Sequence, residues 1–261
     1  MVVGLLKEIK KEEYRVGLTP QAAGDYVRRG HAVLVQEGAG GGSGFGDGDY
    51  ESEGCEVVSR EQVYERSEMI VKVNEPQPSE YPLYREGQIL YTYLHLAADK
   101  ELTRFLLDRR ITGIAYETVM EPDGTLPLLK PMSEIAGRLS IQEGAKYLEK
   151  TFGGRGILLG GVPGIRRGKI VILGGGTVGR NACKMAVGLG AEVTILDISA
   201  KKLEFLDDVF GSSITTLYST KSNLLESLRE ADVVIGGVLI PGGAAPKLVR
   251  REDLSVMKAG A

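Results

Sequence analysis

The sequence has few of the residues that form disulfides or bind metal ions in small proteins. It has no tryptophan, two histidines and two cysteines, Cys55 and Cys183, in 261 residues. Two cysteines cannot form the disulfide framework of a small secreted domain, and we expect no metal site. The opening segment MVVGLLKEIKKEEYR lacks the basic stretch, apolar run and small-residue cleavage site of a secretory signal. We therefore expect a protein of the reducing cytoplasm.

Long apolar runs and single-sign charge runs are also missing. The longest apolar stretches, such as Ile111–Ala115 and Ile170–Leu173, are far shorter than the ~20 residues of a membrane span. The net charge of −3 is spread over mixed signs, so nothing predicts contact with nucleic acid or with an anionic membrane surface. The expected partners are small molecules and other subunits.

The sequence is rich in glycine and shows an alternation of strand-like and helix-like segments. Short apolar runs alternate with helix-like segments from the first residue, a pattern typical of βαβ units and a mostly parallel sheet. A chain of 261 residues with 43% apolar composition is at the size where one domain tends to become two. The 36 glycines indicate tight turns between ordered elements. We expect an α/β fold with two Rossmann-like domains.

The first domain, which we expect to be the substrate domain, spans residues 1–130. Thr19 and Pro20 predict a helix start, Gly30 its end, and Ser59 with Gln62 a capping box for a helix that runs to about Ser67. A further helix is expected over Asp99–Arg109. The expected strands are Val2–Leu6, Ala32–Gln36, Glu68–Val73, Ile89–Leu94 and Ile111–Ala115.

The second domain, residues 131–261, is expected to be an incomplete doubly wound, NAD-binding sheet. A bridging helix over residues 133–150, with Ser133 as its N-cap, leads into it because apolar residues recur there at helical spacing. A helix is also expected over Arg180–Leu189. The expected strands are Lys169–Leu173, Glu192–Leu196, Ile214–Tyr218 and Asp232–Ile235.

A dinucleotide-binding motif follows the strand KIVIL. In GGGTVG the glycines Gly174, Gly176 and Gly179 fit G-x-G-x-x-G around Thr177 and Val178, with a helix-like segment directly after them. Such glycines permit a tight turn, let a diphosphate approach the backbone and let the helix pack on the strand. An ordinary glycine turn is the alternative. We interpret the second glycine cluster, Gly38–Gly48, as such a structural turn.

An acid at the end of the next strand selects between the two nicotinamide dinucleotides. Asp197 lies about 20 residues beyond the motif, where a carboxylate reaches the ribose hydroxyls and repels the 2′-phosphate of NADP. Ile198, not an arginine, comes next. The pattern predicts NAD, although Lys201 and Lys202 leave NADP open.

Nine segments of the chain, in this order, carry a resemblance to a known family: KEIKKEEYRVGLTP, GHAVLVQEGAG, ILYTYLHLAAD, GIAYETV, LPLLKPMSEIAGRLSIQEGA, GGRGILLGGVPG, VILGGGTVG, VTILDIS and VLIPGGAAPKLV. They resemble the alanine dehydrogenase family over essentially the whole chain. Members of that family interconvert L-alanine with pyruvate and ammonium using NAD, carry a substrate domain and a Rossmann domain, and assemble as hexamers. The resemblance therefore implies a cytoplasmic, homo-oligomeric oxidoreductase of L-alanine catabolism and amino-acid metabolism.

The resemblance also implies roles for individual residues. Arg15 corresponds to the arginine that binds the substrate carboxylate, and His95 to the catalytic histidine. Without the motif match, either side chain would be taken for a surface residue. Tyr93, Leu129 and Met132 match substrate-pocket positions, although the last two could equally pack in a core. The implied cofactor contacts, each with a structural alternative as cap, surface charge or packing residue, are Ser133, Asp197, Lys202, Ser219, Val238 and Leu239.

The chain departs from the family in two loops and at its end. Asn74, in KVNEP, stands where the family has a lysine that faces the substrate, and residues 241–246 read PGGAAP for the family's PGAKAP. The related transhydrogenase subunit tolerates asparagine at the first position. Family chains also continue past the segment Met257–Ala261 into an aspartate-bearing strand and nicotinamide loops. We therefore expect a truncated enzyme with an unpaired strand at 232–235, cofactor binding, and little alanine turnover.

Three functions remain open from the sequence. The first is NAD-dependent oxidative deamination of L-alanine and its reverse. The second is a transhydrogenase-like hydride carrier, which Asn74 favours and which His95 and the segment SEIAGR disfavour. The third is a non-catalytic dinucleotide-binding remnant with a role in assembly or regulation.

Overall fold

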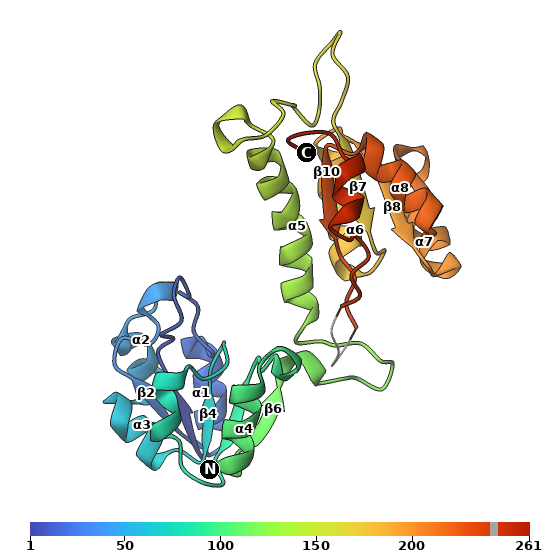
Figure 1. The fold of residues 1–261 in the computed structure, drawn as a ribbon. Helices are drawn as coiled ribbons and strands as arrows, with labels where there is room; N and C mark the ends of the chain where they lie inside the picture. Colours follow the sequence, from blue (N-terminus) through green and yellow to red (C-terminus); the bar gives the residue numbers. More distant parts are fainter. Residues whose placement is uncertain (241–244) are drawn as a thin grey trace. The chain divides into compact units, whose positions relative to one another are not determined.

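The chain forms two compact α/β units in a computed structural model that describes residues 1–240 and 245–261. Unit 1 runs from Met1 to Leu128, and unit 2 begins at Leu129 (Figure 1). This division lies close to the boundary expected after residue 130. Each unit contains one wholly parallel sheet among its described residues, as the alternating sequence pattern predicts.

The sheet of unit 1 has six strands in the order β3-β2-β1-β4-β5-β6. The chain moves outward from β1 in one direction and then returns to start again at β4 on the other side. Loops after β1 and β4 therefore diverge at a topological switch point, where open α/β sheets bind their ligands. The strands are β1 (Val2–Leu5), β2 (Ala32–Gln36), β3 (Glu56–Val58), β4 (Met69–Val71), β5 (Ile89–Thr92) and β6 (Thr112–Ala115).

The helices of unit 1 begin at the caps that the sequence predicts. The Thr19 hydroxyl accepts the amide of Ala22, and Ser59 and Gln62 form the reciprocal capping box. The edge strand β3 and the short helix α2 were not predicted, because three and six residues are too few to show a period. The helices are α1 (Pro20–Arg28), α2 (Asp47–Ser52), α3 (Arg60–Arg66) and α4 (Lys100–Asp108).

Successive residues of the central strands of unit 1 pack into different layers. Val33 and Val35 join one apolar cluster, and Leu34 between them joins another on the opposite face. This alternation follows from the two-residue period of a strand covered on both faces by helices. The predicted strand 68–73 is shorter in the structure, since β4 pairs only over Met69–Val71. The Lys72 amide and the Val73 carbonyl still bond to Tyr91 and Tyr93, and residues 74–75 lie in the loop beyond them.

The sheet of unit 2 has four strands in the order β10-β7-β8-β9, and all four expected strands are present within a residue of their predicted ends. Ile170 and Ile172 pack on one face, and Val171 and Leu173 on the other. The elements are β7 (Lys169–Leu173), β8 (Glu192–Asp197), β9 (Ile214–Tyr218), β10 (Val233–Gly236), α5 (Lys130–Tyr147), α6 (Thr177–Gly188), α7 (Ala200–Phe210) and α8 (Lys221–Glu230).

The boundaries of two helices in unit 2 differ from the prediction. Helix α5 begins at Lys130 after Leu129, and the Ser133 amide donates to the Leu129 carbonyl, so Ser133 as the N-cap is wrong. Pro131 in the first turn explains the earlier start, because its fixed φ suits that position. The expected end at 150 is also too late, since α5 ends at Tyr147. Helix α6 begins at Thr177 and not at Arg180, with extended Gly176 before it.

Helices α5 and α6 approach each other closely through glycine. A Cβ atom added to Gly137 would lie 2.3 Å from the Val178 carbonyl oxygen, so no larger residue fits without movement of the backbone. This contact brings the first half of α5 beside the start of α6.

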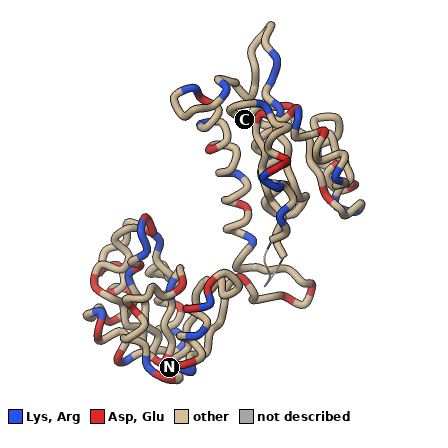
Figure 2. Tube along the Cα trace, viewed as in Figure 1, with Lys and Arg blue, Asp and Glu red and all other residues tan. Residues whose placement is uncertain are grey.

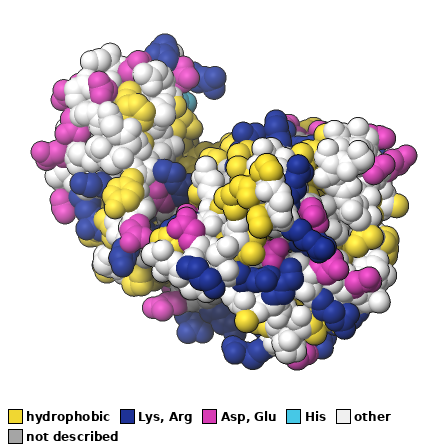
Figure 3. Space-filling model, turned by 90° about the horizontal axis from the view of Figure 1, so that it is seen from above, with side chains coloured by type: hydrophobic (Ala, Val, Ile, Leu, Met, Phe, Trp, Pro, Cys, Tyr) yellow, Lys and Arg dark blue, Asp and Glu magenta, His cyan; other side chains and the backbone are white. Residues whose placement is uncertain are grey.

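Both signs of charge are interspersed along the trace of each unit (Figure 2). On the face that Figure 3 shows, apolar side chains reach the surface among them in small groups. Exposed large apolar residues of this kind are common on soluble protein surfaces. In unit 2, the exposed large apolar residues include Leu158, Val162 and Ile165, which precede β7 in the sequence.

Candidate active site

The polar loops of unit 1 leave the sheet at the same edge. Because parallel strands end together, the segments after β1, β4, β5 and β6 converge beyond the carboxyl ends of these strands. Lys10, Glu13 and Arg15 follow β1, and residues 72–75 follow β4. Tyr93 and His95 follow β5. The sequence-predicted Arg15, Asn74, Tyr93 and His95 therefore belong to a single unit and to one end of its sheet.

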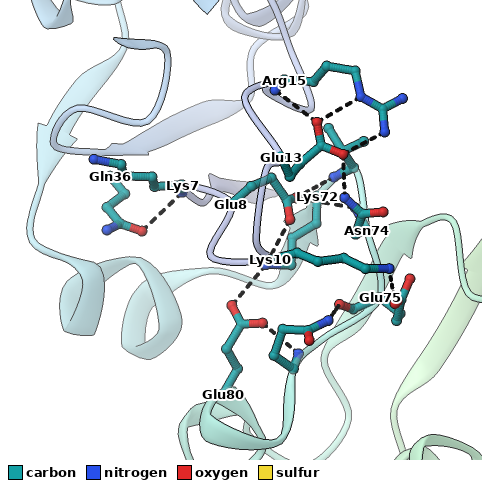
Figure 4. Close-up of polar contacts among 12 residues, drawn as sticks. Lys7, Glu8, Lys10, Glu13, Arg15, Gln36, Lys72, Asn74, Glu75 and Glu80 are labelled. Carbon is teal, nitrogen blue, oxygen red and sulfur yellow. Dashed lines mark hydrogen bonds and ion pairs between the residues drawn. The ribbon is translucent and has the colours of Figure 1, made fainter. Parts of the chain in front are cut away.

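Arg15 is oriented by a carboxylate that the sequence analysis did not identify. Its Nε and one terminal nitrogen donate to the two oxygens of Glu13, at 2.8 and 2.6 Å (Figure 4). The Arg15 guanidinium holds the pKa of Glu13 down at about 2, with further help from the Asn74 amide. A bidentate pair of this kind fixes the plane of the guanidinium. It prepares a half-exposed cation for a planar anion such as a carboxylate.

Asn74 is buried in this cluster. Its side-chain Nδ2 donates to Glu13 at 2.6 Å, and its backbone amide donates to Glu8 at 3.3 Å. A residue expected to face the substrate thus contacts the carboxylate that orients Arg15 (Figure 4). Whether it also touches substrate stays a prediction.

His95 has a strained backbone that a second carboxylate holds. Its φ of 50° lies in the left-handed region, which is uncommon for residues other than glycine. The Glu117 carboxylate accepts the backbone amides of Leu94 at 3.1 Å and of His95 at 2.7 Å. This clamp turns the chain sharply after β5, and the His95 side chain remains 60% exposed. Exposure of this kind suits a residue that must exchange protons with a ligand.

The His95 ring lies between an aromatic ring and an acid. The Tyr93 ring lies at a centroid distance of 6.0 Å with an interplanar angle of 22°, and the Tyr93 hydroxyl donates to the Leu128 carbonyl. His95 Nδ1 is 3.7 Å from Glu75 Oε2, while Lys10 donates to Glu75 Oε1 at 2.6 Å. Sequence reasoning missed Glu75, although it directly follows Asn74 in KVNEP.

A buried ionic network lies beneath these loops. Lys72 is fully buried, and its ammonium lies 2.8 Å from Glu80 and 3.6 Å from Glu8. Burial raises the pKa of Glu8, although Lys72 and two backbone amides favour its charged form. Glu8 accepts the amides of Val73 and Asn74. The network therefore holds the β4 loop in place, and a lysine that directly follows a buried apolar strand was the sequence signal for it.

The glycine turn of unit 2 has the shape that a diphosphate needs. Gly174 has a φ of 102°, and a Cβ atom on Gly179 would lie 1.8 Å from the Gly174 carbonyl oxygen. A Cβ atom on Gly176 would meet nothing within 4 Å. The turn thus requires its first and third glycines for its own geometry, and it presents the middle one to open space before the N-terminus of α6. These residues fit a dinucleotide.

The predicted adenosine-side residues gather at the ends of neighbouring strands. Asp197 ends β8 and accepts the amides of Gly175 at 2.6 Å and Ser199 at 2.8 Å. The Lys202 ammonium lies 3.7 Å from the same carboxylate, and the Ser219 amide donates to the Asp197 carbonyl. Val238 borders the turn, because its Cγ2 lies 2.8 Å from a Cβ placed on Gly174.

The remaining predicted positions have locations in the fold, but their roles toward a ligand stay predictions. Leu129, Met132 and Ser133 belong to the start of α5 in unit 2, and their contacts with ligands stay predictions, as does that of the exposed Leu239. Residues 241–244 of the second departure from the family lie outside the described residues. Within the described ranges, no helix is long and apolar enough to cross a membrane, and no three acidic, histidine or cysteine side chains could share a metal ion.

The chain has two parallel α/β units. One carries a glycine turn that fits a dinucleotide, and the other carries an arginine and a histidine at its switch point. This combination is that of a dinucleotide-dependent oxidoreductase. Comparison with known families agrees and is more specific. "Alanine dehydrogenase/PNT, N-terminal domain" matches residues 4–136, and the corresponding C-terminal domain matches residues 140–261. The chain belongs to the alanine dehydrogenase family.

Individual relatives cover the whole chain. Alanine dehydrogenase of Methanococcus maripaludis is 53% identical over all of this chain and 70% of its own length. That of Bacillus subtilis is 54% identical over 68% of its length. A solved L-alanine dehydrogenase superposes with a TM-score of 0.90 at 52% identity, covering 100% of this chain and 72% of that one. A transhydrogenase from Sinorhizobium meliloti gives 0.81 at 25% identity, covering 100% and 76%.

Proposed function

We propose that this protein catalyses the NAD-dependent oxidation of L-alanine to pyruvate and ammonium, and the reverse reaction. The observation that carries the proposal is the pairing, at one end of one sheet, of a carboxylate-oriented arginine with a strained, exposed histidine. A 2-amino acid and its 2-oxo acid share a carboxylate and differ at the adjacent carbon. One cation and one proton-transfer group are therefore the chemistry that their recognition and interconversion need.

Arg15 would bind the substrate carboxylate. The guanidinium carries five N–H donors in a fixed plane, and Glu13 accepts from Nε and one terminal nitrogen. The carboxylate of Glu13 keeps that plane fixed while a ligand approaches. Exposure of half of the Arg15 side chain supports this role.

His95 would move the proton. Oxidation of an amine to an imine, followed by addition of water, requires a base for the amino group and for the attacking water, and an acid in the reverse direction. A bound NAD supplies the acceptor for the hydride that leaves the substrate Cα. Tyr93 and the β5 loop restrict the orientations that the imidazole can adopt, so less conformational entropy is lost when the ring is positioned for reaction.

The choice of NAD over NADP would rest on Asp197. Its carboxylate is held by two backbone amides at the end of β8 and repels a 2′-phosphate. We expect tighter NADH than NADPH binding in the wild type and a reduced preference in Asp197→Ala, measured by fluorescence titration. Wild-type preference for NADPH would contradict this role.

The reaction is tested by following the absorbance of NADH formed from L-alanine and NAD, in the chain and in a form extended with the C-terminal segment of the Bacillus subtilis relative. We expect His95→Gln to lower kcat about 10²- to 10⁴-fold in the extended form. Arg15→Gln should chiefly raise KM. An extended chain without alanine-dependent NADH formation would overturn the proposal.

Asn74 and the likeness to the Sinorhizobium transhydrogenase favour one second candidate, a carrier of hydride between two dinucleotides. Transfer from NADH to an NADP analogue without any amino acid would support it. The same assay mixture, with alanine added, separates the two activities.

A further inference from the structure

We propose that Glu75 is a positioning residue that accepts the Nδ1–H of His95 and so fixes the tautomer in which Nε2 is the basic atom presented to the substrate. This inference rests on the proposed function for its catalytic meaning. The geometry that supports it needs no ligand, because the partners are two side chains of unit 1.

Glu75 has one oxygen engaged and one available. Lys10 donates to Oε1 at 2.6 Å and holds the carboxylate in place. Oε2 is buried and accepts no hydrogen bond from any residue that the structure describes. A buried carboxylate oxygen without a donor is costly, so a nearby N–H group that can reach it gains stabilisation.

His95 Nδ1 lies 3.7 Å from this oxygen. A hydrogen bond between nitrogen and oxygen forms at about 2.9 Å, so closure requires a movement of roughly 1 Å. Catalytic hydrogen bonds are often long before a ligand binds and shorten when it does. A small rotation of an exposed side chain is enough for this movement.

The surroundings guide that rotation. Glu117 fixes the backbone that leads into His95 by accepting the successive amides of Leu94 and His95, and the Tyr93 ring lies nearly parallel to the imidazole. Glu117 is engaged with the backbone, whereas Glu75 faces the ring. The two acids thus have separate roles. Glu117 holds the strained backbone conformation of His95, and Glu75 determines which ring nitrogen of His95 carries the proton.

A fixed tautomer matters for the chemistry. Neutral imidazole has one donor and one acceptor nitrogen, and the hydrogen bond at one nitrogen decides which form is present. With the proton on Nδ1, the lone pair of Nε2 is directed away from Glu75. At metal sites, loss of the carboxylate that orients a ligating histidine lowers metal affinity or activity roughly 10- to 100-fold, and we expect an effect of similar size here.

The tautomer can be measured directly by nitrogen NMR of histidine-labelled protein at a pH where both rings are neutral. The chain has only two histidines, so each signal is readily assigned. His31 serves as an internal control, since its Nδ1 lies 3.3 Å from the amino terminus and far along the sequence from Glu75. We expect His95 to carry its proton on Nδ1 in the wild type.

The variants separate a proton-directing role from a structural one. In Glu75→Ala the His95 population should move toward the Nε2–H form, while His31 is unchanged. Lys10→Met is the matched control, because it breaks the same ion pair and leaves the carboxylate, so it should keep Nδ1–H. Wild-type His95 mainly in the Nε2–H form, or a population unaffected by Glu75→Ala, would overturn the proposal.

The kinetic measurement uses the extended chain and Glu75→Gln. We expect kcat to fall roughly 10- to 100-fold while NADH affinity is unchanged. A normal tautomer shift without any alanine turnover would contradict the proposed function and leave the Glu75–His95 pair intact. Alanine turnover without the tautomer shift would support the proposed function and contradict the role of Glu75.

Discussion

Unit 1 and unit 2 have the same kind of sheet but place their charges differently. In unit 1, Lys72, Glu8 and Glu80 are buried together directly beneath the candidate substrate loops. In unit 2, the buried acids Asp197 and Asp232 lie at strand ends, where they accept backbone amides, and the cations that pair with Asp232 and with the buried Asp253 are partly exposed. The core between those ends is apolar.

The difference reflects two ways of recognising a ligand. The glycine turn of unit 2 offers N–H groups of the backbone, so its site needs space more than side-chain chemistry. The site that we propose in unit 1 uses the side chains of Arg15 and His95, and each has a neighbouring acid, Glu13 or Glu75. A side-chain site therefore brings more charge into the fold, and the buried network supports the loops that carry it.

The largest expected effect is the loss of stability when Lys72 is removed. Lys72→Met leaves Glu8 and Glu80 buried together without a cation, and we expect it to lower the free energy of unfolding by about 3 to 5 kcal/mol. Lys221→Met in unit 2 is the matched control, because its ion pair with Asp253 involves a half-exposed ammonium. It should cost no more than about 1 kcal/mol. Urea unfolding of both variants measures the two losses of free energy of unfolding. Equal losses would contradict the contrast between the units.

A smaller, pH-dependent effect is expected at Glu13. Its folded pKa of about 2 lies below the ordinary 4.5, so its contribution to stability is complete above pH 4.5 and is lost as the pH falls toward 2. Because Arg15 is half exposed, we expect only about 2 kcal/mol at neutral pH. The stability difference between wild type and Glu13→Gln should shrink from pH 5 to pH 2. A difference independent of pH would show that the carboxylate charge is not involved.

The smallest expected effect is a gain of ligand affinity in Asn74→Lys. A lysine here would lie beside Glu13 and add a second cation near Arg15, so pyruvate should bind roughly tenfold more tightly. Asn74→Met controls for side-chain size without charge. Pyruvate titration in the presence of NADH measures both, and unchanged affinity in the lysine variant would mean that position 74 does not face the ligand.

Features that are fixed by local spacing along the chain could be predicted from the sequence. The glycine turn and Asp197 occupy fixed places along one βαβ unit, so the turn and the acid that contacts it could be located from spacing alone. The helix starts at Thr19 and Ser59 were predicted for the same reason, since a cap acts within three residues.

Long-range partners could not be predicted in this way. Glu117 lies 22 residues from His95, and Asn74 lies 61 residues from Glu13, so only the strand order brings them together. Asn74 was identified as unusual, but its bond to Glu13 was not foreseen. Ser133 failed as a cap because Pro131 starts the helix a turn earlier.

NADH affinity in two variants tests the central contrast most directly. Gly176→Val should keep the fold, because its Cβ position meets no atom within 4 Å, yet fill the space before α6 where the diphosphate would lie. We expect fluorescence titration to show NADH binding weakened about 100-fold or more in this variant. Gly188→Ala, at the far end of α6, and Arg15→Gln should stay within about twofold of wild type. NADH binding that survives Gly176→Val, or that falls equally in Arg15→Gln, would contradict a backbone site in unit 2 and a side-chain site in unit 1.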